Sequence, residues 1–381
     1  MHLDTGVSTE QIGTAQVLPE RPSRARIVQK IDAMISNLTT IKDESGTFLL
    51  HFSDVVVDDK SWNVWNWPQG IGLYGIYKNY RLTGNPLAAD VVQEWFDKAL
   101  EVGAPPKNVN TMAPLLAMAC LYEDTKDSRY VPYLDQWARW AMHDMPRTEG
   151  GGLQHITYAG PNTQQLWDDT LMMTVLPLAK IGRLLDRPEY IEEAKYQFLI
   201  HAQYLMDKKS GLWFHGWSFD RKDNYAGALW ARGNCWITIA IPEFIGVLAL
   251  KAGDPLREWL LHILRSQVSA LAEMQDESGM WHTLLDDPTS YLESSATAGI
   301  AYGLLKAVHE RYIDSSYAAV ADKAVAALCD QITPDGEVQN VSVGTGMGED
   351  MDFYKNIDKT AMPYGQSLTA LCFTEYLVSF C

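Results

Sequence analysis

The chain has 381 residues, of which 47% are hydrophobic and 21% are charged, and its formal net charge is −17. This balance predicts a globular fold with enough apolar material for a core, and the acidic charge argues against a nucleic-acid partner, because phosphate binding needs clustered Lys and Arg. No run of eighteen apolar residues predicts a membrane span. Residues 1–24 are polar and lack periodicity, so we expect a poorly ordered segment there.

Six segments have one apolar stripe and a charged opposite face, which is typical of helices with one side in water. In chain order they are 27–38, 87–99, 130–141, 191–205, 256–271 and 317–328. The stripe of the second is expected to be Leu87, Val91, Trp95 and Ala99. Six further segments, apolar nearly all round, are expected to be buried helices. They are roughly 70–82, 111–122, 169–184, 234–250, 294–309 and 364–380.

The two kinds of segment alternate with a spacing of about sixty residues, which is an internal repeat. Six outer and six inner helices in alternation predict an all-α fold, the (α/α)6 barrel, as a single domain over residues 25–381. An open α-solenoid is the alternative, although its repeats would be shorter and more uniform.

The loops of the predicted barrel are of two lengths. Connections from inner to outer helices are short and carry cap residues, such as Gly253-Asp254-Pro255. Connections from outer to inner helices are long, at about 39–68, 144–168, 207–233, 273–293 and 333–363. Long loops in a compact domain are usually functional. All of them must emerge where the inner helices begin, so we expect the site at that end.

The long loops are rich in Trp, His and isolated polar side chains. Trp faces stack on the C–H faces of a pyranose ring, and forked polar groups bind its hydroxyls or a carboxylate. Single Trp residues could instead cap the core, but the group together favours a sugar cleft. Arg232 lies among Trp230, Asn234 and Trp236, where a carboxylate such as that of a uronic acid is a suitable partner.

Two neighbouring acids stand where the third inner helix is expected to begin, in Trp167-Asp168-Asp169-Thr170. One could cap the helix while the other faces the cavity, and their spacing does not choose between them. His155 and His215 are pocket residues or structural histidines.

Neither a metal nor a cofactor is expected from the sequence. No set of His, Cys and carboxylates has metal-ligand spacing. Gly150-Gly151-Gly152 lacks the strand and the Lys-Ser/Thr of a phosphate loop. The amino terminus has neither the basic start nor the apolar run of a secretory signal. Because the five cysteines are widely spaced and mostly lie in apolar patterns, we expect a cytoplasmic protein.

Several motifs, taken together and in order, resemble the unsaturated rhamnogalacturonyl hydrolases of glycoside hydrolase family 105, relatives of the unsaturated glucuronyl hydrolases of family 88. They are residues 108–114, 145–148 with His155, 167–171, 215–217, 230–236 and 291–295. The resemblance implies an (α/α)6 barrel. It also implies a small oligosaccharide substrate, produced by a polysaccharide lyase, that ends in a 4,5-unsaturated uronic acid. Unsaturated galacturonate linked to rhamnose is the expected example.

The resemblance also implies a chemistry and a set of site residues. In the family an Asp protonates the vinyl ether carbon C4 and helps water add at C5, after which the hemiketal opens and releases the neighbouring sugar. Carried over by position, this Asp is Asp169. The residues expected to bind substrate are Trp67, Asn110, His155, His215, Trp217, Trp230, Arg232 and Trp236. Asn110 stands where the glucuronyl hydrolases have a second Asp. Desolvation by Trp would raise the pKa of Asp169 and the helix N-terminus would lower it, and the sequence leaves the balance open.

Three other functions fit parts of the pattern. An inverting glycosidase acting on a saturated oligosaccharide would need a second carboxylate, such as Asp168, Glu293 or Asp350. A sugar epimerase would use paired histidines, such as His155 and His215. A helical scaffold or carbohydrate-binding protein would need no catalytic acid. The sequence does not indicate an oligomeric state.

Overall fold

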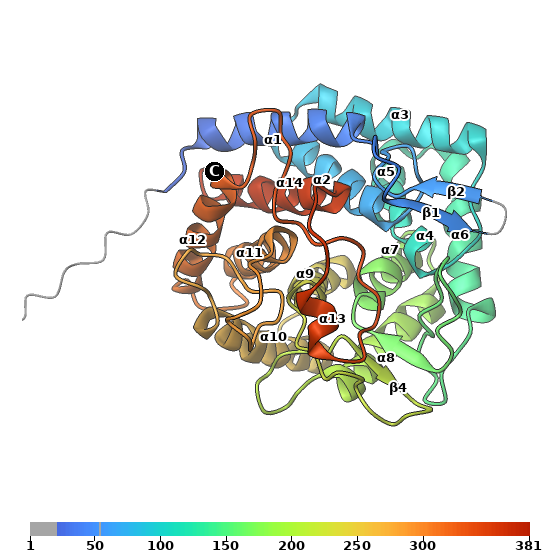
Figure 1. Cartoon of the computed structure of the whole chain (residues 1–381). Helices are drawn as coiled ribbons and strands as arrows, with labels where there is room; N and C mark the ends of the chain where they lie inside the picture. Colours follow the sequence, from blue (N-terminus) through green and yellow to red (C-terminus); the bar gives the residue numbers. More distant parts are fainter. Residues whose placement is uncertain (1–20, 53–54) are drawn as a thin grey trace, which may run out of the picture.

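The computed structural model of the chain describes residues 21–52 and 55–381, and in this part twelve long helices alternate between an outer and an inner ring (Figure 1). The outer helices are α1 (Arg24–Thr40), α3 (Pro86–Val102), α6 (Val131–Arg139), α8 (Pro188–Leu205), α10 (Pro255–Glu273) and α12 (Tyr317–Asp330). The inner helices are α2 (Trp67–Thr83), α5 (Pro114–Thr125), α7 (Leu176–Leu184), α9 (Ala231–Leu248), α11 (Ser294–His309) and α14 (Pro363–Val378). Of the segment 1–24, residues 1–20 lie outside the described residues, and Arg24 begins α1.

The inner ring is closed. Its helices contact one another in chain order, and α14 returns to pack against α2, while each outer helix packs on an inner one. Contact between the first and last inner helices is what distinguishes a barrel from an open solenoid. The predicted (α/α)6 barrel is therefore confirmed.

The burial of each helix follows from its sequence pattern, except at the first turn of α3. In α9 every residue from Ala231 to Ile245 is buried, whereas α10 buries a stripe that includes Leu260, Leu264 and Leu271. In α3 the predicted stripe is wrong at Leu87, which is 71% exposed, whereas Trp95 is buried and Val91 and Ala99 pack against the core. Pro86 starts this helix, and Leu87 points into water from its first turn. The buried residues of α3 are Ala88, Val92, Trp95 and Phe96.

The connections at the end where the inner helices begin carry most of the remaining structure. It consists of the strands β1 (Leu49–Phe52), β2 (Val55–Asp58), β3 (Gln165–Trp167) and β4 (Gly216–Ser218), the short helices α4 (Val109–Met112) and α13 (Met351–Lys355), and the π-helical turn η3 (Leu171–Val175), which leads into α7. The all-α prediction omitted two small antiparallel sheets, β1–β2 and β3–β4. In the second sheet Trp167 lies opposite Gly216, which joins two of the long loops.

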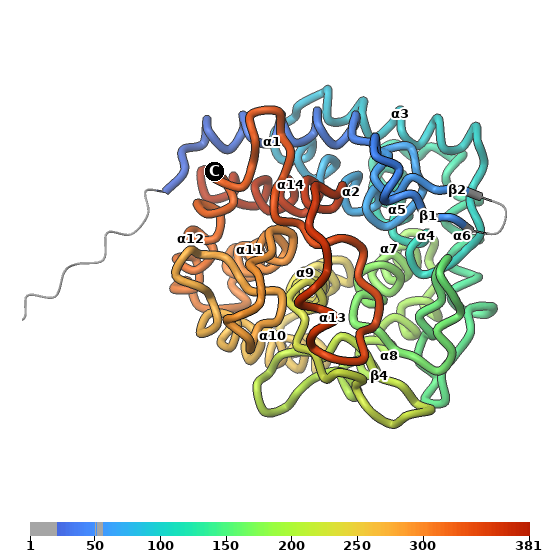
Figure 2. Tube along the Cα trace, in the orientation of Figure 1, coloured from blue at the N-terminus to red at the C-terminus, as the bar shows by residue number. Residues whose placement is uncertain are grey.

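The last connection, residues 331–362 with α13, crosses the loop-bearing end of the barrel (Figure 2). By contrast, the connection between α3 and α4 is short, at residues 103–108. Within the described residues, none of the helices combines the length and the apolar character that crossing a membrane requires.

Candidate active site

A cavity of about 280 Å³ lies among the first turns of the inner helices. Its wall includes Trp67 at the start of α2, Asn110 in α4, Asp169 just before η3, and Arg232 and Trp236 in α9. This is the end of the barrel that the alternation of loop lengths predicts. Helix N-termini carry partial positive charge, so their convergence favours an anionic ligand although the chain as a whole is acidic.

Asp169 faces this cavity from two residues before the start of η3, and its side chain is 18% exposed. Burial raises its pKa to about 7, against the lowering effects of Arg232 and of the nearby peptide N–H groups of Asp169 and Thr170. The sequence left open whether burial or the helix N-terminus has the larger effect on the pKa of Asp169, and in the structure burial has the larger effect. A carboxyl group with such a pKa can hold a proton near neutral pH and also release it.

His155 is the immediate neighbour of Asp169 and carries no opposing charge. Its Nδ1 lies 2.9 Å from the Thr170 hydroxyl and 3.2 Å from Asp169 Oδ1. The ring stacks on Trp167 with centroids 4.1 Å apart. Burial, and then the neighbouring His215 and His201, hold the pKa of His155 well below its usual value. A neutral imidazole at this distance does not stabilise the Asp169 anion as an imidazolium would.

Asp168 points the other way. It is fully buried, and neither of its carboxyl oxygens has a hydrogen-bond partner in the described part of the chain. It packs so closely on Gly233 in the first turn of α9 that a methyl group at Gly233 would collide with the carboxyl. Burial, and then Asp169, raise the pKa of Asp168 well above its usual value. Of the two acids, Asp169 lines the cavity and Asp168 lies behind its wall.

Arg232 lines the cavity and at the same time tethers the last loop. Its guanidinium lies 4.7 Å from the ring centroid of Trp230 and 4.9 Å from that of Tyr364. One terminal nitrogen donates to the carbonyl and hydroxyl of Ser342, and the other donates to Val343 O and Thr345 Oγ1, over 2.6–3.1 Å. The protein carboxylate near it is Glu293, at 3.5 Å. Arg232 thus brings positive charge to the wall and holds residues 342–345 beside it.

The residues expected to bind substrate divide into two groups. Those that line the cavity are Trp67, Asn110, His155, Trp230, Arg232 and Trp236. His215 and Trp217 are not among its lining residues. His215 lies behind the wall, with Nδ1 2.8 Å from the Tyr354 hydroxyl and its ring against Trp167 and Trp230. Trp217 packs on Tyr204 and Phe219.

The three acids considered as a second catalytic carboxylate all lie away from the cavity lining. Asp168 is buried behind the wall, Glu293 caps α11 through the peptide N–H of Ala296, and exposed Asp350 caps α13. The carboxylate that sequence reasoning missed is Asp59, just after β2. It accepts a 3.1 Å hydrogen bond from Asn66, and burial raises its pKa to about 6. No motif surrounds Asp59; only its place in the first long loop could have suggested it.

The wall contains further residues outside the expected set. They are Asn66, Thr157, Tyr158, Ala159, Trp167, Met173, Gly344, Thr345 and Gly346. Ala159, Gly344 and Gly346 are exposed, whereas Asp59, Asn66, His155, Arg232 and Trp236 are buried. The cavity therefore opens to solvent between loops 145–170 and 331–362 and has its floor among the inner helices.

Comparison with known proteins identifies the class. Residues 40–380 match Glycosyl Hydrolase Family 88, so the chain belongs to this family and is a glycoside hydrolase rather than a scaffold or a binding protein.

Its similarities within that class are more specific. The chain is 35% identical over 316 residues to the unsaturated rhamnogalacturonyl hydrolase YesR of Bacillus subtilis, which covers 82% of this chain and 90% of that protein. A crystal structure from Salmonella enterica serovar Paratyphi A, described as a possible GH105 family member, has a TM-score of 0.94 at 55% identity and covers 95% of this chain and 97% of that one. Another so described, from Klebsiella pneumoniae, has a TM-score of 0.93 at 52% identity, covering 99% and 100%. These findings confirm the resemblance drawn from the motifs.

Proposed function

We propose that this glycoside hydrolase removes a 4,5-unsaturated uronic acid from the end of lyase-generated oligosaccharides by hydrating the C4=C5 double bond, with Asp169 as acid and base. The observation that carries the proposal is a cavity-facing carboxyl whose pKa is raised to about 7 beside a neutral histidine. A vinyl ether accepts a proton at carbon, and the donor must carry that proton near neutral pH.

The reaction needs one group that acts first as an acid and then as a base. Protonated Asp169 donates its proton to C4, and positive charge develops at C5, shared with the ring oxygen. Water adds at C5, and the Asp169 carboxylate takes up the proton that this water loses. The hemiketal then opens to a ketone at C5, which leaves a hemiacetal at C1 that expels the neighbouring sugar as an alcohol. The net change is the addition of one water, and Asp169 ends in its starting state.

The cavity supports an anionic sugar as substrate. Arg232 and the helix N-termini supply positive charge for the uronate carboxylate, and Trp67, Trp230 and Trp236 supply aromatic surface. Galacturonate and glucuronate differ only in configuration at C4, and the double bond erases that difference. Selection between them must therefore come from the linkage and the neighbouring sugar. The relative from Bacillus subtilis, a rhamnogalacturonyl hydrolase by name, favours rhamnose as that sugar.

The first experiment follows the ultraviolet absorbance of the conjugated alkene. Incubation with lyase products of pectin, rhamnogalacturonan, ulvan and glycosaminoglycans should abolish the absorbance for at least one class, with the rhamnogalacturonan product fastest. Asp169→Asn should fold and lose this activity by a factor of at least about 10³, near the upper range for loss of a general acid or base. Retained activity in this variant would refute the role of Asp169.

An inverting glycosidase remains the alternative, because Asp59 provides the cavity with a second carboxylate. A saturated oligosaccharide separates the two routes. An inverting glycosidase hydrolyses it at the anomeric carbon, whereas hydration requires the C4=C5 double bond and leaves the saturated substrate intact. The epimerase alternative lacks support, because it needs two histidines in the cavity. Both His155 and His215 contact Trp167, but of the two only His155 lines the cavity.

We also propose a single catalytic domain over residues 25–381 and a cytoplasmic location. The closed helical ring supports the first proposal. The second is supported by the five cysteines, all of them unpaired and four of them buried. Cell fractionation tests the location.

A further inference from the structure

Asp59 and Asn66 form a polar pair in the floor of the cavity that the proposed reaction does not use. Both side chains line the cavity, with exposures of 8% and 3%. Asn66 Nδ2 donates a 3.1 Å hydrogen bond to Asp59 Oδ1. A buried carboxylate normally has partners for more than one of its lone pairs. Within the described residues Asp59 has this one bond, which indicates that the cavity supplies the others.

Asn66 carries a second, independent indication of a ligand. It is the N-cap residue of α2, where an Asn side chain usually accepts hydrogen bonds from the first turn of the helix. Here the side chain makes no such bond and turns to Asp59 instead. Its Oδ1 is buried and has no hydrogen-bond partner within residues 21–52 and 55–381. An amide that gives up its capping role and leaves an acceptor unpaired in a cavity wall fits a donor on the substrate.

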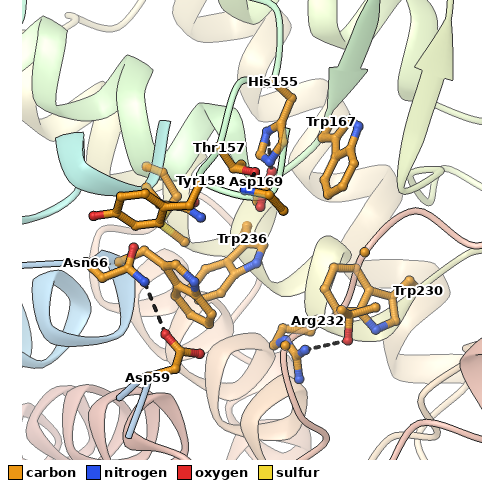
Figure 3. Close-up of a pocket in the computed structure, with 17 residues that line it drawn as sticks. Asp59, Asn66, His155, Thr157, Tyr158, Trp167, Asp169, Trp230, Arg232 and Trp236 are labelled. Carbon is orange, nitrogen blue, oxygen red and sulfur yellow. Dashed lines mark hydrogen bonds and ion pairs between the residues drawn. The ribbon is translucent and has the colours of Figure 1, made fainter. Parts of the chain in front are cut away.

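The charges around the cavity fix which part of a sugar this pair can meet. Figure 3 shows three groups on different sides, Asp59 with Asn66, Arg232 with Trp230, and Asp169 with His155. Burial raises the pKa of Asp169 and Arg232 lowers it. Burial also raises the pKa of Asp59, which the bond from Asn66 lowers and the charge of Asp58 raises, and Arg232 is not among its causes. The uronate carboxylate is attracted to Arg232 and repelled by Asp59. It is attached to C5, and the ring carbon opposite C5 is C2.

We propose that Asp59 and Asn66 bind the 2-hydroxyl and the adjacent 3-hydroxyl of the unsaturated uronic acid, with Asp59 accepting from the 2-hydroxyl and Asn66 Oδ1 from the 3-hydroxyl. This inference rests on the proposed function, since it assumes that the uronic acid occupies the cavity with its carboxylate toward Arg232. It makes Asp59 a binding and specificity residue, distinct from the acid Asp169. It also means that a substituent carrying negative charge at C2, such as a 2-O-sulfate, is excluded by charge as well as by size.

The test compares two enzymes on two substrates that share one leaving group. The probes are the 4-nitrophenyl glycoside of the 4,5-unsaturated uronic acid and its 2-deoxy analogue, assayed with wild type and Asp59→Asn by kcat/KM. A hydrogen bond to a charged group predicts that the preference for the 2-hydroxyl substrate is about 10- to 100-fold greater in wild type than in Asp59→Asn. Comparing preferences cancels the intrinsic effect of the 2-hydroxyl on reactivity. Equal preferences in the two enzymes would overturn the assignment.

Two further variants make the result specific. Asp58→Asn removes the same charge one residue away, outside the cavity lining, and should keep the wild-type preference. Asn66→Ser retains an N-cap residue for α2 but withdraws the amide, and should reduce the preference for the 3-hydroxyl over a 3-deoxy analogue; an unchanged preference overturns the role of Asn66. This variant also tests the pair if Asp59→Asn does not fold.

The behaviour of wild type separates the proposed function from the proposed hydroxyl subsite. If wild type neither releases 4-nitrophenol nor removes the double bond, the proposed function is wrong. If wild type does both and the preferences do not change with Asp59, only the assignment of the hydroxyl subsite is wrong.

Discussion

Replacing the acid of a desolvated site should stabilise the fold while it removes the activity, and Asp169→Asn is the change that tests this. The folded chain holds the pKa of Asp169 at about 7, against 3.8 for the unperturbed group. A pKa that is higher in the folded state means that ionisation costs more there than in the unfolded chain. The penalty is absent below pH 3.8, grows as the pH rises, and is complete above pH 7. Asparagine is nearly the same shape and never ionises.

The expected size follows from the shift. A difference between 3.8 and about 7 corresponds to about 4 kcal/mol at most, because each pKa unit is worth 1.36 kcal/mol. Since 18% of the side chain is exposed toward the cavity, water relieves part of this cost and we expect about 2–4 kcal/mol at pH 8. At pH 5 the unfolded carboxyl is mostly ionised already, so roughly 1.6 kcal/mol of the full value applies there. The advantage of the variant should therefore grow with pH.

The assay is urea or thermal denaturation of wild type and Asp169→Asn, measured at pH 5 and pH 8 with activity recorded in parallel. Asp220→Asn, which removes an exposed carboxyl after β4, is the matched control and should show no growth of its difference with pH. An advantage for Asp169→Asn that is equal at both pH values, or absent at pH 8, would show that the carboxyl is not desolvated. Asp169 would then lack the raised pKa that the proposed proton transfer to the substrate requires.

Three further results are expected from the same geometry. In wild type, kcat/KM should fall tenfold per pH unit above about pH 7, because Asp169 must carry its proton to react; a profile that rises with pH above about 7 contradicts this. Arg232→Lys should raise KM at least about 10-fold, because a lysine cannot donate to both Ser342 and Thr345 and still bind the substrate. An unchanged KM would mean that the two-pronged guanidinium is not needed for binding. Gly233→Ala should cost about 1–3 kcal/mol by collision with Asp168, and Asp168→Ala in the same chain should recover most of it, both by denaturation.

The barrel could be predicted from the sequence because its signal is repeated. A helix such as α11, expected at 294–309 and found at Ser294–His309, is defined by a sixteen-residue segment that is mostly small or apolar on every side. The stripe of α3 shows where the signal weakens. Leu87 and Ala88 are both apolar, so the position of Pro86 at the helix start, and not hydrophobicity, decides which of them faces the core.

The sequence predicts at which end of the barrel the site lies, but not the full set of residues that form it. Trp167 and Gly216 pair through two strands of three residues each, and such short pairings have no periodicity to detect. That pairing brings His215 up behind the wall, against the expectation that it binds substrate. Asp59 was missed for a related reason. Its burial depends on the path of a loop that returns to α2, and no neighbouring residue marks it as a cavity carboxylate.

The cavity has to meet two demands that oppose each other, since positive charge attracts a uronate but also strips the proton from an acid. The contacts of Arg232 allow the structure to meet both demands. Its terminal nitrogens are committed to the loop residues Ser342, Val343 and Thr345, and Glu293 lies 3.5 Å away, so part of its charge is balanced within the wall. His155 stays neutral beside Asp169. Desolvation therefore outweighs the remaining pull of Arg232 on Asp169. A variant that frees Arg232 from Glu293, such as Glu293→Gln, should then lower the pH above which activity is lost.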